Sequence, residues 1–446
     1  MDKNVIAIID GAAGSCGKAK VVGELATNIN LKINASITNC MPNAGHTFVD
    51  EKGNATVFRN IPVAAVNPET ELFIAPGSAI DMDVFIDEYR RVEKYLGNRK
   101  IYVHELVPLI TYEHKEYEKS NIKSGSTNKG CGAVSKDKIL REPSLNFFKG
   151  YKNAVVCSNE EFNDHLFKHL DNKNGYVILE GSQGCDLDLN HSGNYPFVTS
   201  RNVSTTQLLA DSGIPADRLL ETIMVIRPFP IRISNVTKEG SYIYTGDYGT
   251  GNPLYWTQLN IGSKLNTYPT QEIIDDYYGK ILLTSSKIID LLNKSTKVSL
   301  MQLFGKNYES ININDITSLQ LLELERLIFK NAGISNYHSN IIDDDIEDLS
   351  EQTTVTKMER RIFDLDINKL KSNVRTNSPY CLYLNFFQHL SLEARNCKGN
   401  YTDYHFNRYI REYINYIEEM TKTPISSLGT GAKNDEKIKI MELIKK

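Results

Sequence analysis

The stretch VIAIIDGAAGSCGKAKVVGELAT, residues 5–27, decides the fold class of this chain. Residues 5–9 are an apolar, mostly β-branched run of the kind that forms a buried strand, and the run stops at Asp10 and Gly11. A Gly-rich segment follows, and the pattern of residues 18–27 then predicts a helix. Strand, loop and helix in this order are typical of an α/β phosphate-binding unit.

The Gly-rich segment is similar to a P-loop but departs from the pattern G-x-x-x-x-G-K-[ST] at two positions. Ala12 stands where the first glycine belongs, and Ala19 replaces the hydroxyl residue that binds Mg²⁺. Glycines still let backbone N–H groups approach an anion, and the N-terminus of the following helix adds favourable partial charge. On this pattern alone, phosphate binding and a plain strand-to-helix turn both stay open.

Further short apolar runs predict strands at residues 72–74, 101–103, 176–179, 223–226 and 380–384. Because they alternate with amphipathic helical patterns, the predicted fold is α/β, with a large, mostly parallel central sheet flanked by helices. We expect a single domain over residues 1–446 with a peripheral inserted region at 237–351, which contains a predicted helix at 316–330. A periodic helix that includes Phe406 leads to a Gly-containing turn at 428–431.

The composition excludes several classes of protein. With 446 residues, 41% hydrophobic and 24% charged, the chain lies in the range of ordinary globular proteins. A net charge of −4 provides no basic field for a nucleic acid. No apolar run approaches the roughly 20 residues of a membrane helix, so we expect no membrane partner and a cytoplasmic location, in the host cytoplasm if the protein is viral. Seven cysteines without a C-x-x-C pair predict free thiols.

Three more clusters combine glycine with polar side chains, and each has a structural interpretation beside a functional one. Residues 43–47, Asn-Ala-Gly-His-Thr, contain a histidine that could be merely structural. Residues 124–132 form a Gly/hydroxyl/Lys loop suited to anions, or a mobile surface loop. Residues 180–184, Glu-Gly-Ser-Gln-Gly, follow a predicted strand, and an amide such as Gln183 can pair with the edge of a nucleobase.

The order of these clusters resembles the adenylosuccinate synthetase superfamily. Residues 14–20 are similar to its G-D-E-G-K-G-K loop, residues 43–47 match its N-A-G-H-T, residues 126–138 follow its T-T-G-R-G-I-G-P-x-x-x-D-K, and residues 180–184 follow its E-G-A-Q-G. The resemblance implies a P-loop-related α/β fold. It also implies a C–N ligase that joins L-aspartate to C6 of a purine nucleotide through a 6-phosphoryl intermediate, with Mg²⁺ as cofactor.

Ser15 occupies the position of the catalytic aspartate of this superfamily. A serine here, with Met41-Pro42 before Asn43 and with Pro230-Ile231-Arg232, resembles the phage branch, the N6-succino-2-amino-2′-deoxyadenylate synthases. That branch acts on dGMP in making a diaminopurine nucleotide. Guanine carries a 2-amino group beside N1, and a small hydroxyl leaves room for it while still offering an acceptor. The resemblance therefore favours dGMP as substrate.

The resemblance also implies the roles of individual residues. The expected catalytic residues are Ser15, Lys18, His46 and Gln183, and the substrate nucleotide would contact Asn43, Thr127, Gln183, Thr199 and, from the neighbouring subunit of a homodimer, Arg141. The triphosphate would contact Gly14, Ser15, Gly17, Lys18, Gly45, His46, Thr47, Asn385, Gly429 and Gly431. Ser15 and the carbonyl of Gly45 would be ligands of Mg²⁺.

Two segments depart further from the superfamily. Residues 382–386, Leu-Tyr-Leu-Asn-Phe, lack the carboxylate of the guanine-reading T-K-x-D motif, which favours ATP or dATP over GTP as co-substrate. Residues 353–361, TTVTKMERR, only partly follow the aspartate-binding T-T-G-R-x-R-R. Thr354, Thr356, Lys357 and Arg360 are the candidates to bind aspartate, with Met358 where an arginine is expected.

Two other functions stay open at this point. One is ordinary adenylosuccinate synthesis from IMP or dIMP. The other is an inactive purine-nucleotide sensor that retains the pocket but lacks the catalytic aspartate. The sensor predicts nucleotide-dependent thermal stabilisation without release of phosphate.

Overall fold

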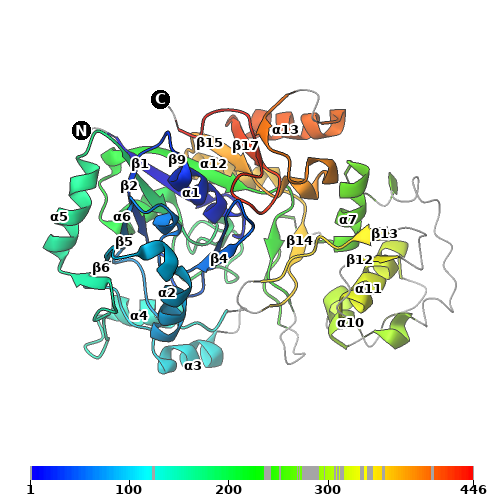
Figure 1. Ribbon diagram of the computed structural model, residues 1–446. Helices are drawn as coiled ribbons and strands as arrows, with labels where there is room; N and C mark the ends of the chain where they lie inside the picture. Colours follow the sequence, from blue (N-terminus) through cyan, green and yellow to red (C-terminus); the bar gives the residue numbers. More distant parts are fainter. Residues whose placement is uncertain are drawn as a thin grey trace.

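The computed structural model describes residues 3–122, 126–235, 243–250, 253–268, 270, 272–273, 291–295, 297–305, 308, 311, 316–331, 336–338, 345–353, 357–402 and 406–444. Eleven of the described strands form one large sheet, which Figure 1 shows in the left and central part of the molecule. In spatial order the strands are β16 (Gly399–Asn400), β18 (Lys437–Lys439), β17 (Ile425–Gly429), β15 (Cys381–Leu384), β9 (Leu219–Ile226), β1 (Val5–Asp10), β8 (Tyr176–Glu180), β2 (Ile33–Thr38), β5 (Glu71–Ile74), β6 (Ile101–His104) and β7 (Ala154–Cys157).

Neighbouring strands of this sheet run parallel except for β17 and β18. The helices that connect or cover them are α1 (Lys18–Thr27), α2 (Met82–Leu96), α3 (Tyr112–Asn121), α4 (Cys131–Leu140), α5 (Asn159–Leu170), α6 (Thr205–Ser212), α12 (Ile367–Asn377) and α13 (Arg408–Thr421). This arrangement confirms the predicted mostly parallel α/β fold.

Successive residues of β1 point to opposite faces of the sheet, and both faces are buried. Val5, Ala7 and Ile9 lie in a core that α5, α6, α12 and α13 cover. Ile6 and Ile8 lie in a second core, covered by α1 and α2. A strand that is buried on both faces needs apolar residues at every position, which is why residues 5–9 form an unbroken apolar run.

The part of the chain around residues 231–363 adds two small sheets and three helices beside the large sheet. β10 (Ile231–Arg232), β14 (Arg361–Phe363) and β11 (Pro253–Leu254) form an antiparallel sheet, and β12 (Asn336–His338) pairs with β13 (Asp345–Glu347). The helices here are α7 (Trp256–Leu265), α10 (Lys297–Phe304) and α11 (Ser318–Asn331), on the right of Figure 1. The hairpin of β3 (His46–Val49) and β4 (Ala55–Phe58) lies beside α1.

Most predicted elements agree with the structure. The helix predicted at 18–27 is α1, and that predicted at 316–330 is α11, displaced by one or two residues. The turn predicted at 428–431 is wrong in its first half, because Leu428 and Gly429 belong to β17, where they pair with Ile438 and Lys437 of β18. The predicted C-terminal helix begins at Arg408, after Phe406.

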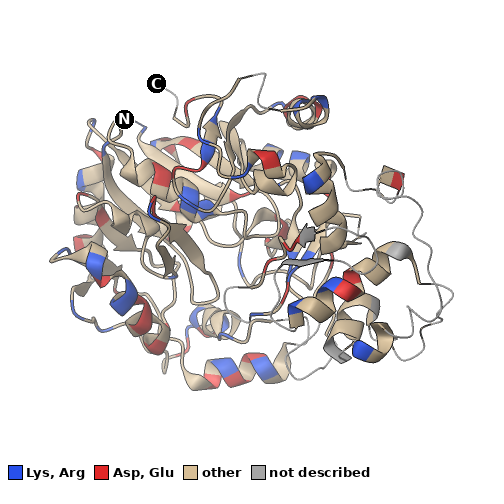
Figure 2. Ribbon diagram, turned by 45° about the vertical axis from the view of Figure 1, so that its right-hand side comes forward, with Lys and Arg blue, Asp and Glu red and all other residues tan. Residues whose placement is uncertain are grey.

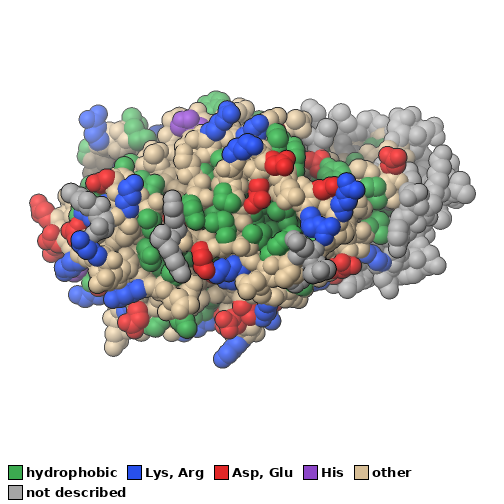
Figure 3. Space-filling model, turned by 90° about the horizontal axis from the view of Figure 1, so that it is seen from above, with side chains coloured by type: hydrophobic (Ala, Val, Ile, Leu, Met, Phe, Trp, Pro, Cys, Tyr) green, Lys and Arg blue, Asp and Glu red, His purple; other side chains and the backbone are tan. Residues whose placement is uncertain are grey.

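The surface agrees with the near-neutral charge of the chain. Figure 2 shows acidic and basic residues interspersed along the ribbon, and on the face seen in Figure 3 apolar side chains lie among charges of both signs. None of the helices in the described ranges is long and apolar enough to cross a membrane. All seven cysteines are free, as predicted.

Candidate active site

Two adjoining cavities open at the edge of the sheet where β1, β2 and β8 end, with volumes of about 400 Å³ and 330 Å³. Because Asn43, Thr127, Gln183 and Arg360 line both, the two cavities form one cleft. Of the predicted residues, the first cavity is lined by Gly14, Ser15, Gly17, Lys18, Asn43, Gly45, His46, Thr47, Thr127, Gln183 and Arg360. The second is lined by Asn43, Thr127, Gln183, Thr199 and Arg360.

The loop after β1 is folded around the buried carboxylate of Asp10. This carboxylate accepts hydrogen bonds from the backbone N–H groups of Ala12, Gly14 and Cys16, at 3.0, 3.2 and 2.9 Å. Lys18 Nζ lies 3.4 Å from Asp10 Oδ2. An internal carboxylate therefore takes every second N–H of the loop, and Ala13, Gly14, Ser15 and Gly17 line the cavity.

Ser15 is exposed at the wall of the first cavity and has a φ of 57°, in the left-handed region. The fully buried Arg227, which follows β9, donates from Nη1 to the carbonyl of Ser15 at 3.2 Å. The same guanidinium lies 4.1 Å from the ring centre of Phe386, which also lines the cavity. Because a serine favours this backbone conformation only when its surroundings hold it there, Arg227 contributes to the placement of the Ser15 hydroxyl.

Lys18 and His46 meet in the first cavity. Lys18 Nζ donates to the carbonyl of Gln183 at 2.7 Å, which ties the loop after β1 to the loop after β8. Burial, with the charge of Lys18 as a smaller cause, lowers the pKa of His46 to about 3. A histidine with so low a pKa is neutral at physiological pH, so it can donate one hydrogen bond to a phosphate oxygen without carrying charge.

A side chain behind the cleft shapes the segment that precedes His46. Nη1 of Arg59 donates to the carbonyls of Pro42 and Ala44 at 2.9 and 3.1 Å. His46 then begins β3, where it pairs with Phe58. All five residues of the predicted cluster 43–47 line the first cavity, so this cluster forms one wall of the cleft.

The loop 126–132 is also organised by an internal carboxylate. Glu118 of α3 accepts from the N–H groups of Gly130 and Gly132 at 2.9 and 2.6 Å and from Ser126 Oγ at 3.1 Å. The N-terminus of α4 is thus capped from within the protein. Thr127 remains at the wall of both cavities.

Gln183 and Thr199 both line the cleft. Gln183 has a φ of 60° and lines both cavities, and Thr199 lines the second. Glu180, from the same motif, does not reach the cleft but accepts from the N–H groups of Val63 and Ala64 at 2.9 and 3.1 Å. The motif therefore combines one structural and one cleft-facing residue.

The predicted aspartate segment contributes mainly Arg360, which lines both cavities. Lys357 is exposed and lines neither. Thr354 and Thr356 lie outside the described residues. Arg360 Nε donates to the carbonyl of Gln352 at 3.2 Å, across a short antiparallel bridge between Gln352 and Glu359.

Besides Lys357, four described residues of the predicted site line neither cavity. Asn385 is buried, and its Nδ2 donates to the carbonyl of Cys16 at 3.0 Å. It therefore supports the loop after β1, residues 11–17, from behind; this loop is the predicted phosphate loop. Gly429 and Gly431 lie near Asn385 and Glu436 respectively. Arg141 is exposed at the C-terminal end of α4.

The sequence reasoning missed the residues that organise the cleft, namely Asp10 and Arg227 behind the first cavity and Glu118 at the wall of the second. An acidic residue at the end of a buried strand, directly before a Gly-rich loop, is a signal that could have indicated Asp10. An arginine directly after the apolar run of β9 could have indicated Arg227 in the same way. Glu118 lies in an ordinary polar helix pattern and carries no comparable signal.

Comparison with known proteins supports the resemblance. The family model described as adenylosuccinate synthetase matches residues 8–174 and 145–238. The N6-succino-2-amino-2′-deoxyadenylate synthase of Cyanophage S-2L is 33% identical over 254 residues, covering 54% of this chain and 67% of that protein. The protein of the same name from Vibrio phage phiVC8 is 30% identical over 279 residues, covering 59% and 76%.

The fold has a counterpart among solved structures. The succinoaminodeoxyadenylate synthetase of Cyanophage S-2L, bound to dGMP and to dATP as an energy donor, superposes with a TM-score of 0.65 and 22% identity. The match covers 98% of this chain and 96% of that one. The chain belongs to the adenylosuccinate synthetase family of C–N bond-forming ligases.

Proposed function

We propose that this protein joins L-aspartate to C6 of dGMP, with ATP or dATP as the phosphoryl donor, and forms N6-succino-2-amino-2′-deoxyadenylate. The observation that carries the proposal is the exposed hydroxyl of Ser15 at the wall of the cleft, where the family has an aspartate. Relatives that bear this name and a related structure bound to dGMP and dATP support it.

The chemistry begins with activation of the carbonyl oxygen O6, because an amine cannot displace it directly. Transfer of the γ-phosphoryl group to O6 breaks its bond to the donor, releases the proton on N1 of the base and gives a good leaving group. The amine of aspartate then attacks C6, and O6 departs within inorganic phosphate. Lys18 and the neutral His46 line the first cavity and would stabilise the transferring group. Gln183 lines both cavities and would face the base at their junction.

Asn43, Thr127 and Thr199 line the second cavity and offer an amide and two hydroxyls for the substrate phosphate. Arg141 would complete that contact from a second subunit. Its exposed position outside both cavities of its own chain supports this assignment. The proposal therefore includes a homodimer.

The residues of the first cavity fit Mg²⁺ bound together with a triphosphate. Ser15 and Gly45 are exposed at its wall and offer a hydroxyl and a carbonyl oxygen. Mg²⁺ takes oxygen ligands and keeps several from phosphates and water. Bound there, it would neutralise charge on the phosphates.

The donor assignment rests on Asn385. Its amide nitrogen is engaged with the carbonyl of Cys16, and the segment 382–386 contains no carboxylate to accept from guanine N1–H and 2-NH₂. An adenine nucleotide needs no such acceptor. ATP or dATP is therefore favoured over GTP.

The proposal is tested with purified protein, L-aspartate and Mg²⁺, combining dGMP, GMP, IMP or dIMP with ATP, dATP or GTP. Succinylated product is measured by mass spectrometry and phosphate by colorimetry. We expect product from dGMP with ATP or dATP. In the variant Ser15→Asp we expect the ratio of kcat/KM for dGMP to that for IMP to fall by about 100-fold, because a carboxylate crowds the 2-amino group.

Product from IMP but not from dGMP in the unmodified protein would favour adenylosuccinate synthesis instead. Nucleotide-dependent thermal stabilisation with no phosphate released under any combination would favour the sensor.

A further inference from the structure

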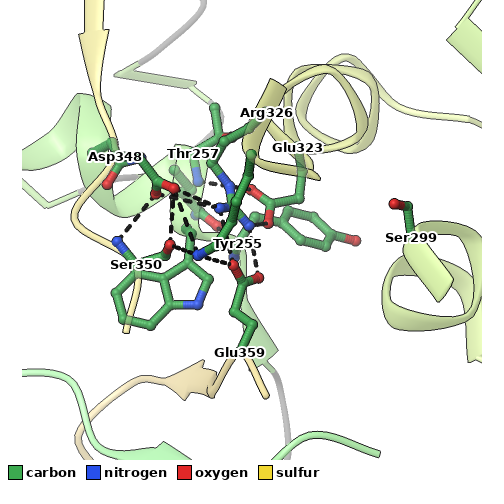
Figure 4. A network of polar contacts seen from close by, with 12 residues as sticks. Tyr255, Thr257, Ser299, Glu323, Arg326, Asp348, Ser350 and Glu359 are labelled. Carbon is green, nitrogen blue, oxygen red and sulfur yellow. Dashed lines mark hydrogen bonds and ion pairs between the residues drawn. The ribbon is translucent and has the colours of Figure 1, made fainter. Parts of the chain in front are cut away.

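Arg326, in the middle of α11, is a fully buried cation whose nitrogens all donate to carboxylates. Nε and Nη2 donate to Glu323 at 3.1 and 2.5 Å, and Nη1 and Nη2 donate to Glu359 at 3.1 and 2.8 Å. Nη1 also donates to both oxygens of Asp348 at 3.2 and 3.1 Å. Figure 4 shows the three carboxylates converging on this one side chain.

The three carboxylates come from different parts of the chain. Glu323 lies one turn away on α11 and also accepts from the N–H of Thr257, at the start of α7, at 2.8 Å. Asp348 precedes the predicted aspartate segment, residues 353–361, and Glu359 lies within it. Arg326 therefore fastens two described arms of the chain to α7 and α11: residues 348–353, which lead into that segment, and residues 357–361, which end it.

Lys330 adds a second cation, with Nζ 2.6 Å from Glu359 Oε2 and 3.7 Å from Asp348 Oδ2, and a hydrogen bond to Ser350. Two cations thus face three carboxylates. Burial alone would lower the pKa of Arg326, but the carboxylates outweigh it and hold that pKa above its usual value. Removing one member of such a buried set leaves uncompensated charge, so the arrangement is held firmly.

The arms are in turn joined to each other and to Arg360. The N–H of Arg360 donates to the carbonyl of Glu351 at 2.8 Å, and that of Thr353 donates to Met358 at 2.8 Å. Trp256 of α7 donates from Nε1 to the carbonyl of Arg360 at 2.7 Å. The backbone of Arg360, which lines both cavities, is thus fixed next to Glu359. Glu359 is the residue that Arg326 holds in place.

We propose that Arg326 is a positioning residue for the amino-acid substrate, and that the inserted region serves to set the aspartate segment and so aim Arg360 into the cleft. This inference rests on the proposed function. It assigns Arg326 no contact with substrate, since the side chain lines neither of the two cavities. It predicts that loss of Arg326 weakens binding of aspartate and leaves binding of dGMP nearly unchanged.

The test compares Arg326→Met, Arg326→Lys and Glu359→Gln with the unmodified enzyme. Arg395→Ala is the matched control, because it removes an exposed arginine–carboxylate pair at Glu347, next to Asp348. We expect Arg326→Met to raise KM for aspartate about tenfold or more, with KM for dGMP within about twofold and kcat within about threefold. We expect the other two substitutions to have a smaller effect in the same direction, and the control none.

Hydrogen exchange gives a readout that does not depend on turnover. In Arg326→Met, amides in residues 348–353 and 357–361 should exchange at least about tenfold faster, while those of the phosphate loop stay unchanged. If Arg326→Met does not fold, Glu359→Gln carries both measurements.

Equal rises in the KM of aspartate and dGMP, or unchanged exchange in both arms, would overturn the positioning role. Absence of any product from the unmodified enzyme would overturn the proposed function instead, and with it the assignment to aspartate. If the amides of the two arms nevertheless exchange faster in Arg326→Met, Arg326 holds the two arms in place but has no demonstrated role in aspartate binding.

Discussion

The phosphate loop and the aspartate segment line the same cleft, but different parts of the chain hold them in shape. Asp10, the residue directly before the phosphate loop, holds it through three backbone N–H groups. The aspartate segment is held by two arginines from other elements, Arg326 of α11 and Arg227 after β9, the latter paired with Glu351. A loop that is held by a residue next to it in the sequence can be recognised from a local motif. A loop that is held by residues far away in the sequence cannot.

Arg227 joins the two regions, since the same guanidinium contacts the carbonyl of Ser15 and the carboxylate of Glu351. His389 contacts it as well, with Nδ1 3.4 Å from Nη2 of Arg227. Substitutions within the phosphate loop should therefore affect the triphosphate first, and substitutions at this junction should mainly affect stability.

The largest effect is expected from Asp10→Asn. An amide in place of the carboxylate brings a donor towards three N–H donors and leaves Lys18 without its ion pair. We expect kcat/KM for dATP to fall by about 100-fold or more and the free energy of unfolding to fall by about 2 to 4 kcal/mol. Steady-state kinetics and urea denaturation measure the two.

The control is Asp50→Asn. Asp50 also accepts from backbone N–H groups, those of Lys52 and Asn54 at 3.0 and 2.8 Å, but in the turn between β3 and β4. The variant Asp50→Asn should leave kcat/KM for dATP unchanged. An Asp10→Asn enzyme with a normal KM for dATP would show that the loop does not depend on its internal carboxylate.

A smaller effect is expected at the junction, from the pH dependence of stability. Burial lowers the pKa of His389 to about 3, against 6.5 for an ordinary histidine. The folded protein thus keeps this group neutral while the unfolded chain binds a proton below about pH 6.5. The free energy of unfolding should therefore fall as the pH falls from about 6.5 towards 3.

Urea denaturation at pH 7.5 and pH 5 measures this loss. In His389→Gln the loss between the two pH values should be smaller by about 2 kcal/mol. The exposed His191 is the control, and His191→Gln should show the loss of the unmodified protein. An equal loss in His389→Gln would mean that this histidine is not buried as a neutral group.

The sequence predicted the parts of the fold that depend on local pattern. Residues 5–27 form the strand, loop and helix expected of them, and both faces of β1 are buried. β18 was not predicted, because its three residues, Lys437, Ile438 and Lys439, are too short a run to carry a strand signal until β17 lies beside them.

The sequence likewise predicted the parts of the site that depend on local sequence motifs. Residues from all four motifs, among them Ser15, His46, Thr127 and Gln183, line the cleft. Asp10, Arg227 and Glu118 were not predicted as site residues, because their roles depend on which backbone groups the fold brings to them. Asn385 was expected at the triphosphate, but it lies behind the loop because its amide reaches Cys16.

The measurement that bears most directly on the proposed chemistry follows the oxygen at C6. dGMP labelled with oxygen-18 at O6 is incubated with the protein, L-aspartate and dATP, and the inorganic phosphate is analysed by mass spectrometry. If a phosphoryl group activates O6, the label appears in the released phosphate in equal amount to the succinylated product. Product accompanied by unlabelled phosphate would contradict that activation.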